Sequence, residues 1–282
     1  MTDVFAALGF DFMRNALLAG LMAGLTCGII GTLVVVNRLV FLSGGIAHAS
    51  YGGVGLAFFF GLAPALGIVG FAILSALAMA AVTLKAKHRA DTVIGVMWAV
   101  GMALGVILID LTPGYNADLM SYLFGSILTV PDSDLWLMLA LNAVILLTVG
   151  FFYHDFLAMS YDEEFAQVRG VPVRPLYYVL LVMIALAVVM VIQVVGLILV
   201  IALLTIPPYI AERHAGSLGR MMGYAVVLNL VFTTTGLWLA YVFNLTSGAT
   251  IIMVAAAGFF ISLAVQRLRR NRVPSDAGPE PA

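Results

Sequence analysis

The amino-acid sequence predicts an all-α, polytopic transmembrane helical bundle. Hydrophobic residues occupy 63% of its 282 positions, and charged residues occupy only 10%. The mean hydropathy is +1.12. A soluble domain has about 25% charged residues and about half apolar residues, so a water-soluble fold could not bury this much apolar surface. The helices are therefore expected to be solvated by lipid.

Uncharged stretches predict about nine membrane spans, at about 20 residues for each span. These stretches are residues 15–37, 39–84, 92–109, 135–153, 175–211 and 221–266. Pro64, Gly196 and residues 244–248 each divide one of the longer stretches into two spans. If the shortest predicted span does not cross the membrane, the total falls to about eight spans. Residues 119–131 are too short for a span and are expected to form a re-entrant or interfacial helix.

The positions of the basic residues predict the orientation of the bundle. If the arginines at 267–272 face the cytoplasm, as the positive-inside rule favours, nine spans place all 13 basic residues except Arg14 on that side. We therefore expect the N-terminus outside and the C-terminus in the cytoplasm. Residues 1–272 are expected to form a single membrane domain, and residues 273–282 a disordered cytoplasmic tail.

Composition and motifs exclude several classes of protein. The net charge of −1 creates no basic field that would attract nucleic acid. Cys27 is the single cysteine, which excludes an internal disulfide and a cysteine-based metal cage. The sequence has no glycine-rich phosphate loop ending in Lys-Ser or Lys-Thr, and its apolar stretches hold one histidine and no acid. We therefore do not expect an enzyme.

Residues 160–172 predict a short, rigid helix on the cytoplasmic side of the membrane. Ser160 and Glu163 have the spacing of a capping box, in which two side chains satisfy backbone N–H groups at the start of a helix. Gly170 can adopt the left-handed conformation that ends a helix, and Pro172 prevents its continuation.

The predicted helix has an acidic first turn and a small apolar face. Glu163 and Glu164 place negative charge where the helix dipole favours it. Phe165 and Val168 are three residues apart and therefore share one face. These features fit either an ordinary interfacial loop helix or a helix that docks on a cytosolic partner.

Residues 160–173, SYDEEFAQVRGVPV, resemble the coupling-helix segment of the permease subunits of zinc, manganese and iron ABC transporters. Further blocks resemble that family in the same order: residues 45–54, 91–96, 121–130, 193–207 and 247–252. Together the blocks extend over most of the chain, between residues 14 and 265. The specificity of the resemblance lies in this ordered set and not in any single block.

The resemblance implies a homodimeric permease of a bacterial inner membrane, which carries a divalent metal cation as its substrate and binds no cofactor. Glu163, Glu164, Phe165, Val168 and Gly170 would couple each copy to a cytosolic ATP-binding cassette subunit, on which ATP is hydrolysed. A periplasmic or extracellular metal-binding protein would deliver the cation. Two alternatives remain open: a permease for a metal chelate such as a siderophore or corrinoid, and an ATP-independent channel or carrier.

His48 is the only histidine inside an apolar stretch and is the candidate metal ligand of the transport path. Ionisable groups at membrane depth are usually functional, and a neutral imidazole suits zinc, manganese or iron. The family has an aspartate four positions earlier, where this chain has Gly44. His48 is thus expected to be either a transit ligand or a structural histidine bonded to a neighbouring carbonyl. Asp110 and Asp118 flank the outer end of a span, where they either line the entrance or are solvated loop acids.

Overall fold

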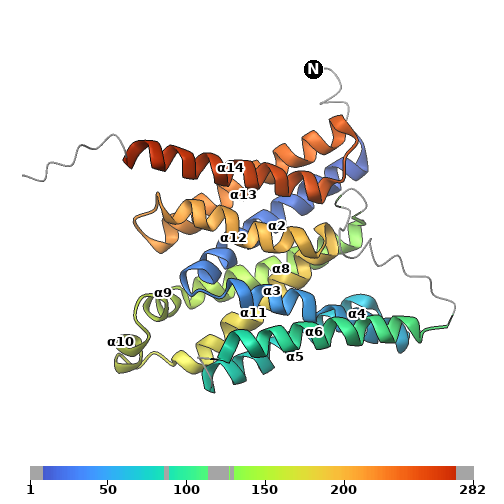
Figure 1. Cartoon of the computed structure of the whole chain (residues 1–282), viewed down its shortest axis with the longest axis horizontal. Helices are drawn as coiled ribbons and strands as arrows, with labels where there is room; N and C mark the ends of the chain where they lie inside the picture. The colour runs from blue at the N-terminus through green and yellow to red at the C-terminus, as the bar shows by residue number, and fades with distance from the viewer. Residues whose placement is uncertain (1–8, 86–88, 114–126, 128–129, 271–282) are drawn as a thin grey trace, which may run out of the picture.

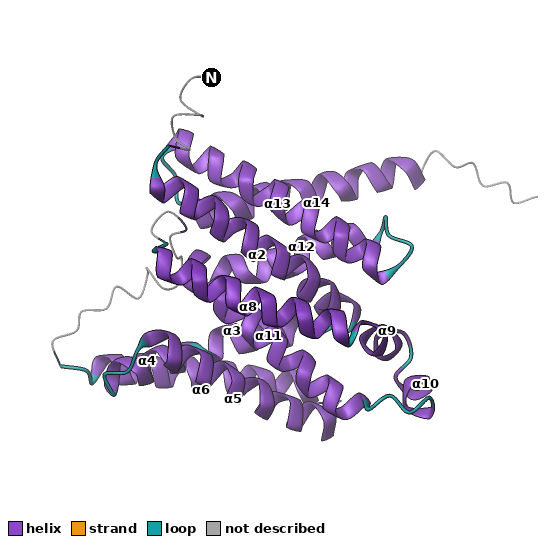
Figure 2. Cartoon of the chain, turned by 180° about the vertical axis from the view of Figure 1, so that it is seen from behind, coloured by secondary structure: helices purple, strands orange, loops and turns teal. Residues whose placement is uncertain are grey.

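The computed structural model of the chain describes residues 9–85, 89–113, 127 and 130–270. Within these residues all regular structure is helical (Figure 2), which confirms the all-α prediction. The predicted interfacial segment at 119–131 lies mostly outside the described residues, and the predicted tail at 273–282 lies wholly outside them. Both stay predictions.

Seven helices of the described chain are long and apolar enough to cross a membrane. They lie broadly alongside one another in a single bundle (Figure 1). The helices are α2 (Asp11–Val36), α5 (Pro64–Lys85), α6 (Ala90–Asp110), α8 (Asp132–Phe151), α11 (Val173–Val195), α13 (Leu218–Phe243) and α14 (Ser247–Arg270).

The two remaining predicted spans take a different form. Helix α12 (Leu197–Glu212) has only 16 residues and follows Gly196, whose positive φ of 80° ends α11. The span predicted after residue 39 consists of two short helices, α3 (Val40–Ala49) and α4 (Tyr51–Phe59), which meet at Ser50. The Ser50 hydroxyl donates a hydrogen bond of 2.6 Å to the Ala47 carbonyl. The seven long helices, α12 and the α3–α4 pair thus correspond to the nine predicted segments.

Glycines allow the helices to pack with their backbones in contact. A Cβ added to Gly28 of α2 would lie 2.6 Å from the backbone nitrogen of Val226 on α13. A second seam joins α6 to the α3–α4 pair, where a Cβ on Gly101 would lie 2.7 Å from Cα of Ala49. Small residues favour such close approach because helix association within a membrane depends on packing. The second seam holds the segment that carries His48 directly against α6.

Two short helices, α9 (Tyr153–Tyr161) and α10 (Glu163–Val168), lie at one end of the bundle (Figure 1). The ends of α2 and α5 and the starts of α6 and α11 meet there around a shared cavity. We name this end of the bundle the α10 end. The helix ends and connections that lie there (Figure 1) carry basic residues in the sequence: Arg38, Lys85, Arg89, Arg169, Arg174, Arg213 and Arg220. Arg14 lies near the start of α2 and forms an exposed ion pair of 2.9 Å with Asp11.

Candidate functional site

His48 lies on the last turn of α3 and is half-buried. Its Nδ1 lies 2.9 Å from the carbonyl oxygen of Gly44. A carbonyl oxygen can only accept, so Nδ1 carries the proton and donates this hydrogen bond. In the neutral imidazole Nε2 then has a lone pair, which is the group that a metal cation requires. The carbonyl-bonded histidine expected from the sequence is therefore present, and its bond leaves the second nitrogen able to act as a ligand.

Gly44 occupies the position where the resembled family has an aspartate. A Cβ added to Gly44 would have its nearest neighbour, Cδ1 of Ile201, at 3.5 Å. That is an ordinary van der Waals distance, so a side chain at this position would not clash at its first atom. The Gly44 carbonyl, and not a side-chain carboxylate, orients the His48 ring in this chain.

Trp98 of α6 stacks on the His48 ring. It was not identified as a site residue from the sequence. The two ring centroids are 3.9 Å apart, with an interplanar angle of 30°. The indole Nε1–H donates to Sδ of Met102, one turn further along α6, at 3.1 Å. Nothing in the local sequence signals this contact, because Trp98 lies on a different helix from His48.

No acidic residue of the described chain joins His48 in a metal-binding cluster. The described residues contain no group of three or more His, Cys, Asp or Glu side chains that could hold a metal ion. Asp110 is the last residue of α6 and is exposed; it lies about 18 Å along the helix from Trp98 at 1.5 Å per residue. Asp118 lies outside the described residues. The entrance role of the two aspartates stays a prediction.

The short helix α10 forms as predicted, but Asp162 caps it and not Ser160. Oδ1 of Asp162 accepts a hydrogen bond of 2.9 Å from the Phe165 backbone N–H. Ser160 belongs to the preceding helix α9, which continues to Tyr161, and its Oγ accepts from the Asn37 side chain at 2.9 Å. The capping-box prediction is therefore wrong, because α9 extends through the serine and only Asp162 has the extended backbone that an N-cap requires.

The outer face of α10 is apolar and exposed. Phe165 is 56% exposed and Val168 is 87% exposed, whereas Ala166 between them is buried. Gly170 has a φ of +84°, the left-handed conformation predicted for the helix end. Glu164 is exposed, and Glu163 is half-buried at the rim of the shared cavity. The capped helix thus presents two apolar side chains at its surface.

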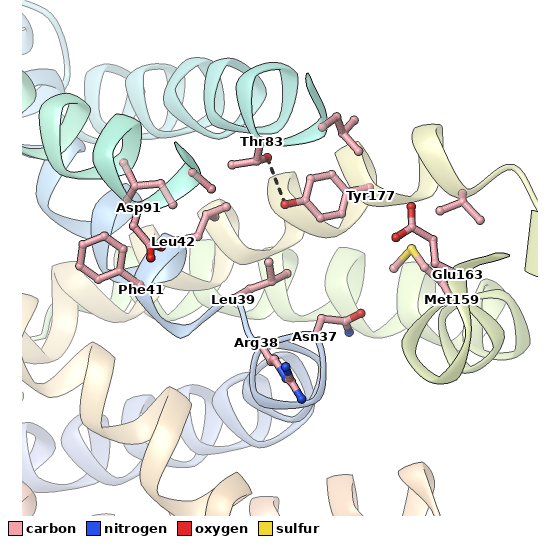
Figure 3. A pocket seen from close by; sticks show the side chains of 14 residues that line it. Asn37, Arg38, Leu39, Phe41, Leu42, Thr83, Asp91, Met159, Glu163 and Tyr177 are labelled. Carbon is pink, nitrogen blue, oxygen red and sulfur yellow. Dashed lines mark hydrogen bonds between the residues drawn. The ribbon is translucent and has the colours of Figure 1, made fainter. Parts of the chain in front are cut away.

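A cavity of ≈ 670 Å³ lies behind α10 at the same end of the bundle (Figure 3). Asp91 lies at one side of it and Glu163 at the other, so the two carboxylates do not converge (Figure 3). Thr83 and Tyr177 bridge α5 and α11 with a hydrogen bond of 3.1 Å at the cavity wall. This cavity links α10 to the ends of the long helices and was not predicted from the sequence.

Comparison with known proteins finds one protein family that matches nearly the whole chain. Residues 9–266 match the sequence profile of the ABC 3 transport family. The chain is 53% identical over 261 residues to the membrane protein slr2045 of Synechocystis, with 93% of each covered. It is 33% identical to the manganese transport system membrane protein MntC of Listeria monocytogenes, with 90% of each covered. Its fold matches a chain of PsaBC from Streptococcus pneumoniae in complex with Fab, with a TM-score of 0.83, 32% identity, and 93% of this chain and 95% of that chain covered.

Proposed function

Because the chain belongs to the ABC 3 transport family, we propose that it is the transmembrane permease subunit of an ATP-driven importer of a divalent metal cation. The observation that carries this proposal is its similarity, over 90% of both chains, to a manganese transport system membrane protein. Mn²⁺ is accordingly the first substrate to test, with zinc and iron as its competitors. ATP is hydrolysed on a separate subunit, and this chain forms the path by which the cation crosses the membrane.

The exposed face of α10 docks on the cytosolic ATP-binding cassette subunit. Phe165 and Val168 point away from the bundle, and an apolar pair on a rigid capped helix is suited to a dry cleft on a partner. Helix α10 packs against α9 and the start of α11, so a push on α10 reaches the long helix α11. A second copy of this chain and an external metal-binding protein complete the assembly.

The α10 end faces the cytoplasm of a bacterial inner membrane, with the N-terminus outside. The basic residues next to the helix ends on that side support this orientation, because cytoplasmic loops carry an excess of Lys and Arg.

His48 is the transit ligand for the cation. Its Nε2 lone pair is available while Nδ1 donates to Gly44, the arrangement in which metal-binding histidines are usually held. The described residues of one chain add no cluster of acids to this nitrogen. A site with few fixed ligands suits transit, because conduction requires a cation to leave as readily as it enters.

Uptake into vesicles tests the proposal directly. The permease is co-purified with its ATPase subunits, reconstituted into lipid vesicles, and supplied with radioactive manganese, zinc or iron and the binding protein. We expect ATP-dependent uptake, with manganese preferred. Uptake without ATP would identify a channel or carrier, and uptake of a siderophore or corrinoid chelate in place of the bare cations would identify the chelate permease.

A pair of histidine variants tests the assignment of the transit ligand. We expect His48→Ala to lower uptake by at least about tenfold, the scale of effect for altered metal-site residues. His214→Ala is a matched control, because Nδ1 of His214 lies 3.0 Å from the Ile210 carbonyl, the same bond to the residue four positions earlier. Both variants lose one such hydrogen bond, and only His48→Ala loses a ligand. Full uptake by an assembled His48→Ala transporter would overturn the assignment.

A further inference from the structure

The indole of Trp98 covers one face of the His48 imidazole within the bundle. The ring centroids are 3.9 Å apart and the ring planes are tilted by 30°. The indole is itself anchored, because its Nε1–H donates to Sδ of Met102 at 3.1 Å. A third aromatic ring, Phe41, lies 6.3 Å from the indole centroid. Trp98 is therefore held in place from its own helix and from α3.

Two contacts restrain the His48 ring. The Gly44 carbonyl holds Nδ1, and Trp98 blocks one face of the ring. Neither contact uses the Nε2 lone pair, which lies in the plane of the ring. We propose that Trp98 is the positioning residue for His48, which holds the imidazole so that Nε2 is presented to the passing cation; this inference rests on the proposed function.

The hydrogen bond at Nδ1 restrains the His48 ring at one edge only. A metal-binding histidine is usually oriented by a carboxylate, a carbonyl or a water on its other nitrogen. Here a single backbone carbonyl does this, and it makes no contact with the faces of the ring. The stack on Trp98 restrains one of those faces. It also favours the loaded state, because a metal-bound imidazole carries positive charge and the face of an indole attracts cations.

The backbone seam between α3 and α6 sets the distance of the stack. Gly101, three residues after Trp98, meets the backbone of Ala49, the neighbour of His48. No side chain separates the two helices at this point. The ring contact is thus a consequence of helix packing and not of a flexible surface side chain.

Transport kinetics of Trp98 variants test the positioning role in the assembled, reconstituted transporter. We expect Trp98→Ala to raise the half-saturating Mn²⁺ concentration about two- to tenfold, the range that an aromatic pair supports, with a smaller effect on the maximal rate. Trp98→Phe retains an aromatic face and should recover most of the affinity. Trp136→Ala, at a position on α8 that is 73% exposed, serves as the control.

Fluorescence of Trp98 gives a second readout, which tests whether Mn²⁺ binds at His48 beside the indole. In full-length permease with Trp136→Phe and Trp238→Phe, Trp98 is the remaining one of the 3 tryptophans. We expect Mn²⁺ to quench its emission saturably, and His48→Ala to abolish the quenching. Quenching that survives in His48→Ala, or no quenching at all, would overturn the proposal.

The outcomes separate this inference from the proposed function. If the unmodified transporter imports Mn²⁺ and Trp98→Ala does so with an unchanged half-saturating concentration, the positioning role is overturned while the proposed function stands. If the unmodified transporter imports none of the three metals, the proposed function falls and this role falls with it. Should Trp98→Ala fail to assemble, Trp98→Leu retains apolar volume without an aromatic face, and an unchanged half-saturating concentration in that variant overturns the role equally.

Discussion

Replacing Gly101 by alanine would force apart the two helices that carry His48 and Trp98. A Cβ at this position would lie 2.7 Å from Cα of Ala49 and 2.8 Å from its carbonyl oxygen. Carbon atoms in contact prefer a separation of about 3.5–4.0 Å. The α3–α6 seam must therefore open by roughly 1 Å. We expect the stack between His48 and Trp98 to loosen by a similar distance.

The energetic cost of the steric clash in Gly101→Ala can be separated from the gain in helix propensity that alanine brings. Inserting a methyl group into a packed contact costs about 1–3 kcal/mol. Alanine in a helix interior is favoured over glycine by about 0.8–1.0 kcal/mol, which partly offsets that cost. Gly95, on the same helix, has nothing within 4 Å of an added Cβ. Gly95→Ala thus keeps the propensity gain without the clash, and the two variants should differ in stability by about 1–3 kcal/mol.

Thermal unfolding of the purified permease measures this difference. We expect Gly101→Ala to have a lower Tm than Gly95→Ala, and Gly95→Ala to equal or exceed the unmodified protein. Mn²⁺ uptake by Gly101→Ala should show the same weakened half-saturation as Trp98→Ala, because both changes loosen the same ring contact. Equal Tm values for the two alanine variants would refute the close α3–α6 contact from which this reasoning starts.

Two further predictions concern the exposed helix and the buried polar groups. Phe165→Asp should abolish transport-coupled ATP hydrolysis without affecting membrane insertion, because burying a carboxylate in a docking cleft costs on the order of a few kcal/mol; normal coupling in the inserted variant would refute the docking role. Asn229 is 0% exposed and its amide has no hydrogen-bond partner among the described residues, whereas Asn142 accepts from Thr26 and donates to the Met138 carbonyl. In thermal unfolding, Asn229→Leu should be neutral or stabilising and Asn142→Leu should cost about 1–3 kcal/mol; the opposite order would show that Asn229 is satisfied by a group such as a bound water.

The parts of the fold that could be predicted from the sequence are those set by local chemistry. Apolar length marks a span, and Gly196 ends α11 because its φ of 80° suits glycine. Pro64 begins α5, and Gly170 ends the segment after α10. Each of these signals lies within a few residues of the feature that it predicts. The capping prediction at Ser160 was wrong for the same reason, since the serine and Asp162 are two equally local candidates and the length of α9 decided between them.

The parts of the candidate site that could not be predicted depend on contacts between helices. Gly95 and Gly101 cannot be told apart in the sequence of α6. In the structure Gly101 packs against the backbone of Ala49, whereas an added Cβ at Gly95 would contact nothing within 4 Å. His48 could be identified from its isolation in an apolar stretch, but its orientation depends on an indole fifty positions further along the chain. In this chain the Gly44 carbonyl holds one edge of the imidazole. By our proposal Trp98 holds one face of it, and the Gly101 seam places that indole within reach.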